Sequence, residues 1–170
     1  LLPAVLWRDG KTWRALPALR PALWEVTRIV TAFTFAHSVT LTLAAWQLIT
    51  VPSRLVESVI AASVILAALN NIYPVVVRKR WLMALLCGFI HGCGFATVLT
   101  DLGLQSTSLA LSLVAFNVGI ELAQLAIVVV FLPLAFKLRH AWIYPNFLLR
   151  VGSVGIAVLG IVWLVERVFD

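Results

Sequence analysis

Three ionisable side chains lie near the centres of apolar runs that are each long enough to cross a bilayer. They are His37, His91 and Glu121. An ionisable group is costly to place in hydrocarbon, so such residues usually line ion or proton paths. Imidazole and carboxylate groups are also common ligands of transition metals. The three side chains therefore predict a metal site at one depth of a helical bundle. The alternative is a structural cluster of hydrogen-bonded polar groups.

Other polar residues share helix faces with these three. Asn117 and Gln124 fall within about 40° of the same line as Glu121, so we expect them to surround the site or its pathway. Cys87 lies four residues before His91 and faces the same way. This pair could hold a soft or borderline metal, or Cys87 could be a small buried packing residue.

A stripe of hydroxyl side chains in the first apolar run passes beside His37. Its members are Thr27, Thr31, Thr34 and Ser38. They recur at helical spacing within about 40° of one line. If they bond only to carbonyls of their own helix, His37 becomes a packing residue. If His37 faces inward, it becomes a candidate ligand.

Glu57 and Asn71 share one face of the second apolar run, about 21 Å apart at 1.5 Å per residue. Glu57 could mark the outer mouth of a cation path, or reach from its helix to the interface. Asn70 points about 100° away from Asn71. We therefore expect that the two cannot serve one site and that one of them holds helices together.

The composition predicts the fold class. Of 170 residues, 62% are hydrophobic and 12% charged, and the mean hydropathy is +1.04. A soluble domain has about 45–50% apolar and about 25% charged residues. The sequence thus predicts an all-α integral membrane protein, a polytopic helical bundle in a lipid bilayer. The net charge of +6 sits in short clusters between apolar runs, which favours topology signals over a nucleic-acid partner.

The apolar runs predict five complete transmembrane helices within one domain, residues 27–166. The spans are about 27–49, 55–77, 81–100, 108–136 and 147–165. Residues 1–26 are expected to form the end of a preceding helix and a basic interfacial loop. Lys and Arg alternate between the loops, which places loops 7–26, 78–80 and 137–146 in the cytoplasm and the C-terminus outside.

Four ordered stretches resemble the HupE/UreJ family. Residues 33–44 are similar to its FTxAHSxTLxLA signature, and residues 56–71 to its VExxIAxS…AxxN block. Residues 88–96 resemble its GxxHGxGFA block, and residues 116–124 its FNxGxExxQ block. The resemblance implies a bacterial inner-membrane protein associated with hydrogenase or urease systems, a nickel permease or accessory factor.

By that resemblance, the family's polar motif positions are occupied by His37, Glu57, His91, Asn117 and Glu121. The chain departs from the family pattern in two ways. An earlier helix with a GxxHxxxGxDH-type motif would precede Leu1, and Cys93 stands where the family often has a bulky apolar residue.

The residues and the resemblance together predict a protein that binds or moves a divalent transition metal, nickel first, with zinc, cobalt or copper as alternatives. His37, His91 and Glu121 would be its ligands. One alternative is a membrane subunit or metalloenzyme-assembly factor that does not itself transport. Another is an intramembrane metal-dependent hydrolase. Since the chain has no HExxH or nucleophile motif, we expect that it is not an enzyme.

Overall fold

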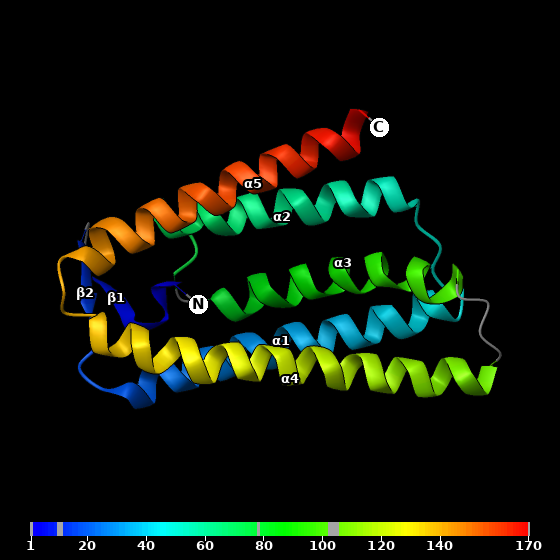
Figure 1. The fold of residues 1–170 in the computed structure, drawn as a ribbon, viewed down its shortest axis with the longest axis horizontal. Helices are drawn as coiled ribbons and strands as arrows, with labels where there is room; N and C mark the ends of the chain where they lie inside the picture. The colour runs from blue at the N-terminus through cyan, green and yellow to red at the C-terminus, as the bar shows by residue number, and fades with distance from the viewer. Residues whose placement is uncertain (1, 10–11, 78, 102–105, 170) are drawn as a thin grey trace.

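The computed structural model describes residues 2–9, 12–77, 79–101 and 106–169, and helix dominates them (Figure 1). A π-helical turn, η2 (Tyr144–Leu148), leads into the last helix. The long helices are α1 (Leu19–Ala45), α2 (Ser53–Ile72), α3 (Arg80–Asp101), α4 (Ser106–Leu138) and α5 (Leu149–Phe169). Residues 10–11 and 78 of the predicted loops lie outside the described part of the chain.

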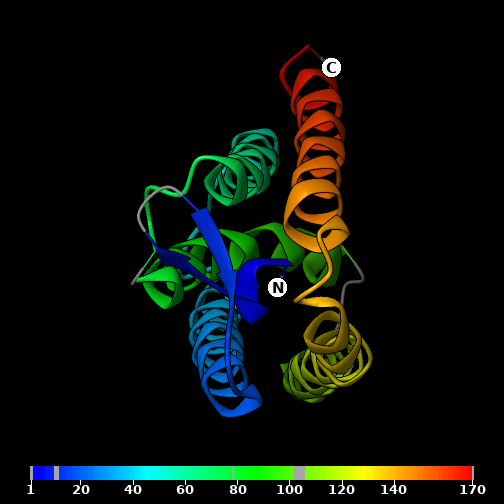
Figure 2. The same cartoon turned by 90° about the vertical axis from the view of Figure 1, so that its left-hand side faces the viewer.

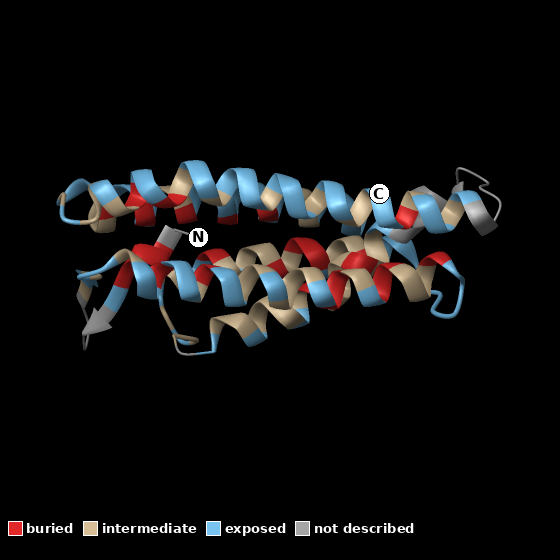
Figure 3. Ribbon diagram, turned by 90° about the horizontal axis from the view of Figure 1, so that it is seen from below, coloured by how far each residue is buried: buried red, intermediate tan, exposed pale blue. Residues whose placement is uncertain are grey.

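Four of these helices are long and apolar enough to cross a membrane: α1, α2, α4 from Ser108, and the continuous helix Tyr144–Phe169. The prediction of a helical membrane protein is thereby confirmed. The corresponding part of α3, Arg80–Phe95, is apolar but shorter, so the fifth span stays a prediction. Figure 3 shows that the outward sides of the helices are largely exposed, as expected for surfaces that meet lipid.

The N-terminal segment differs from the expected helix tail and loop. It forms a 3-10 turn, η1 (Leu2–Val5), and two antiparallel strands, β1 (Leu6–Asp9) and β2 (Thr12–Ala15). The two strands pair from Leu6 with Ala15 to Asp9 with Thr12. Figure 2 shows the hairpin across one end of the bundle.

Helix α1 begins at Leu19, earlier than the predicted start at residue 27. Pro21 does not prevent this, because the first turn of a helix has no partner for its N–H groups. The early start lets Ala22 and Val26 pack against the buried N-terminal residues Ala4, Val5 and Leu6.

The helices pack as two close pairs, α1 with α3 and α2 with α5, while α4 lies beside α1 (Figure 1). Gly88 and Gly92 bring α3 against α1. A Cβ at Gly88 would lie 2.5 Å from the Phe33 carbonyl oxygen, and one at Gly92 would overlap Thr40. Small residues let membrane helices approach in this way. The pairing fixes how α1 presents His37 and its neighbours.

Candidate functional site

The polar stripes of α1 and α4 face each other. Ser38 Oγ donates a 2.8 Å hydrogen bond to Asn117 Oδ1, and Thr34 Oγ1 donates one of 3.0 Å to Gln124 Oε1. Hydrogen bonds between membrane helices help to hold them together. Asn117 and Gln124 thus position α4 on one side of α1.

Glu121 lies on α4 between Asn117 and Gln124. It lines a cavity of about 380 Å³ together with Thr27 and Thr31. Among the described residues, no hydrogen bond or ion pair engages its carboxylate. The carboxylate is therefore open to a cation or a proton from the α1–α4 side.

His37 is enclosed by aromatic rings. Its side chain is 1% exposed, and its ring stacks on Phe33 and Phe116, with centroid distances of 5.8 and 6.4 Å. Phe95 meets it edge-on at 5.8 Å. Neither ring nitrogen has a hydrogen-bond partner among the described residues. A buried polar atom without a partner costs about 1–3 kcal/mol, which points to more than a packing role.

His91 is held by its own helix. Its Nδ1 lies 2.7 Å from the Cys87 carbonyl oxygen. Because a carbonyl only accepts, Nδ1 carries the proton, and the lone pair is on Nε2. A backbone carbonyl often fixes a metal-binding imidazole in this manner. Phe33 contacts this ring as well, edge-on at 5.4 Å. One phenylalanine therefore touches both histidines.

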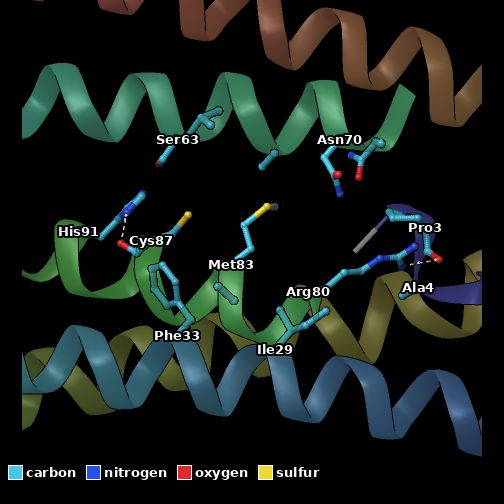
Figure 4. A pocket seen from close by; sticks show the side chains of 14 residues that line it. Pro3, Ala4, Ile29, Phe33, Ser63, Asn70, Arg80, Met83, Cys87 and His91 are labelled. Carbon is cyan, nitrogen blue, oxygen red and sulfur yellow. Dashed lines mark hydrogen bonds between the residues drawn. The ribbon is translucent and has the colours of Figure 1, made fainter. Parts of the chain in front are cut away.

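The His91 side chain lines a cavity of about 290 Å³ between α1, α2 and α3 (Figure 4). Two further predicted residues, Asn71 and Cys87, line it too. Sequence reasoning missed other polar or sulfur-containing members of the lining: Ser63, Met83 and Arg80. Met83 could have been found, because it precedes Cys87 and His91 at the same four-residue spacing.

Asn70 and Asn71 both border this cavity. Their hydrogen bonds nevertheless differ. Asn70 Oδ1 accepts from the backbone N–H groups of Val75 and Val76, which closes the turn after α2. Asn71 Nδ2 donates to Ser153 Oγ on α5 at 3.2 Å. The expectation that one of the pair holds helices together is confirmed for Asn71.

Glu57 lies at the other end of α2. Its carboxylate forms a 2.6 Å ion pair with Arg167 on α5. The neighbouring Arg54 donates to the backbone carbonyls of Arg167 and Val168. Glu57 and Arg54 therefore connect the start of α2 to the end of α5 through an ion pair and hydrogen bonds.

The structure does not bring the three predicted ligands together. Within the described ranges, no three His, Cys, Asp or Glu side chains are grouped closely enough to hold a metal ion. The physical reason is that α3 and α4 pack on different sides of α1. His91 therefore faces the α2 side, whereas Glu121 faces the outer seam.

The arrangement offers a metal ion one oriented imidazole and one thiol, His91 and Cys87, at the same cavity. The His37 ring stacks on Phe33, and its nitrogens have no partner among the described residues. Comparisons with curated proteins and with solved structures gave no match. A family model described as "HupE / UreJ protein" matches residues 2–167, essentially the whole chain. The chain therefore belongs to the HupE/UreJ family.

Proposed function

We propose that this protein binds a divalent transition metal, nickel or cobalt first, inside the membrane and moves it across. The family is associated with nickel or cobalt transport or with an accessory function. The observation that carries the proposal is the Nδ1 hydrogen bond of His91 to its own helix. That bond presents the Nε2 lone pair towards a cavity in which a cation has room.

His91 would be the first ligand and Cys87 its neighbour on the same wall. His37 would join when Phe33, which contacts both imidazoles, moves aside. Glu121 would act separately, as the charged group of the α1–α4 seam, attracting the cation or carrying a proton. Asn117 and Gln124 would hold α4 in position against α1. Glu57 would pair with Arg167 at the outer end of the bundle and would not bind the metal.

The membrane would be the bacterial inner membrane. Its orientation is supported by cation–aromatic pairs at the end of the bundle that carries the hairpin. Arg80 lies 5.6 Å from the Trp13 ring, and Arg28 lies 5.9 Å from Trp81. Basic residues mark the cytoplasmic side, and tryptophans mark the interface. This end, with loops 7–26, 78–80 and 137–146, would face the cytoplasm.

Uptake into proteoliposomes distinguishes transport from an accessory role. The full chain should carry nickel or cobalt inward, and His91→Ala should reduce this uptake at least tenfold. His140→Ala is the matched control, because His140 is exposed beyond the end of α4. Metal binding without uptake would support the accessory alternative and contradict transport.

A further inference from the structure

We infer that Met83, Cys87 and His91 form a ladder of ligands along α3 that conducts a soft or borderline metal cation. This inference rests on the proposed function and names the cation class and its path. All three side chains line the cavity of about 290 Å³. Figure 4 shows their sulfur and nitrogen atoms directed into the space between α3 and α2.

The spacing suits transfer from one ligand to the next. The three residues follow one another every four positions, which is about 6 Å per step along the helix. Each step turns only about 40° around the axis, so one wall presents all three. The thioether, the thiol and the imidazole are thus offered in sequence.

The chemistry of the walls discriminates against hard cations. Sulfur and imidazole ligands select copper(I), zinc, nickel and similar ions, whereas magnesium and calcium need carboxylate or carbonyl oxygens. None of the described residues that line this cavity is an Asp or a Glu. Arg80 places a positive charge at its end near Pro3, where its Nη1 donates to the Pro3 carbonyl. Because the lining described has a positive charge and no carboxylate, a cation would have to be held here by coordination to neutral ligands.

The polar side chains on the opposite wall of the cavity make hydrogen bonds to other protein groups. Ser63 on α2 donates its hydroxyl proton to the Ile60 carbonyl oxygen of its own helix at 2.7 Å. The Asn70 amide is occupied by the turn after α2, and Asn71 donates to Ser153. The sulfur and imidazole groups of α3 are therefore the ligands that this cavity offers to a soft cation.

Cobalt(II) tests the central step of the ladder, because a thiolate bound to cobalt gives a charge-transfer absorption. The purified full chain should show this band when titrated with cobalt(II). Cys87→Ser should abolish it, whereas Cys93→Ser should retain it. Cys93 is the matched control, because its Sγ contacts the Phe89 carbonyl and does not line the cavity. A band that survives Cys87→Ser, or is missing although metal is bound, would overturn the inference.

Copper(I) tests the step at Met83, near the start of α3. Met83→Leu keeps the side-chain volume but removes the thioether, which is a copper(I) ligand. Copper(I) affinity should fall about tenfold, with little change in cobalt(II) affinity. If the affinities for copper(I) and cobalt(II) fall equally, or if neither affinity falls, the role of Met83 is overturned. If His91→Ala abolishes metal binding but no sulfur signature is found, the ladder fails and the proposed function stands. If the unaltered chain binds none of these metals, both fail.

Discussion

Ser38 on α1 donates a 2.8 Å hydrogen bond to Asn117 on α4, and this pair determines which side of α1 faces α4. Because Ser38 follows His37 directly, the same rotation leaves His37 on the flank of the seam, stacked on Phe116. The α1–α4 contact therefore sets the seam and places Phe116 beside His37, while Phe95 of α3 meets His37 from another helix.

The seam hydrogen bond should contribute measurably to the free energy of unfolding. A double-mutant cycle with Ser38→Ala and Asn117→Ala should give a coupling of about 0.6 kcal/mol, the average for such bonds between membrane helices. Unfolding in mixed detergent micelles measures it. Thr42→Ala combined with Asn117→Ala should show no coupling, because Thr42 bonds the Ser38 carbonyl within α1. Equal coupling in both cycles would contradict the contact.

The α1–α3 contact should not tolerate a side chain at Gly92. Gly92→Ala should destabilise the protein by about 1–3 kcal/mol, because the added methyl overlaps Thr40 and the His37 carbonyl. Gly119→Ala on α4 is the control, since a Cβ there meets nothing within 4 Å. Thermal unfolding of both variants tests this. Similar melting temperatures would show that α1 and α3 are not so closely packed.

The Glu57–Arg167 ion pair should matter little for stability. Its side chains are 30% and 45% exposed, and exposed pairs contribute about 0–1 kcal/mol. Glu57→Gln should therefore lower the free energy of unfolding by less than about 1 kcal/mol, with metal affinity unchanged. A large loss of metal affinity would mean that Glu57 belongs to the metal site.

Glu121 should be needed for movement of the metal but not for its binding at His91. The two residues line different cavities, His91 between α1, α2 and α3 and Glu121 between α1 and α4. Glu121→Gln keeps the shape and removes the charge, so uptake should fall at least tenfold while equilibrium metal content is retained. If uptake by Glu121→Gln is unaltered, Glu121 has no role in moving the metal and is only one of the residues between α1 and α4.

The sequence allowed the helices to be predicted but not their rotations. Each helical segment is an apolar run bounded by charges or by a break such as Pro52, so its existence follows from local pattern. The polar faces of α1 and α4 follow from the same spacing. Which faces meet depends on contacts such as Ser38 with Asn117 and Gly92 with Thr40. That is why an expected similar depth in the membrane did not predict whether Glu121 and His91 meet.

Short and local features were also beyond the sequence pattern. The strands Leu6–Asp9 and Thr12–Ala15 are too short to show a clear alternation, and their Trp and Arg residues favoured an interfacial loop. Asn70 was interpreted by its helix direction, yet its amide folds back to the turn at Val75. Helical spacing predicts the direction of a side chain only when that side chain extends away from its helix and does not fold back to the backbone.

The most direct test of the account is the metal content of the purified full chain after loading with nickel or cobalt. Elemental analysis should find close to one metal ion per chain in the unaltered protein and in His140→Ala. His91→Ala should lose at least nine-tenths of it, because the oriented Nε2 ligand is gone. Equal metal content in His91→Ala, or no metal in any of the three proteins, would contradict a metal site at His91.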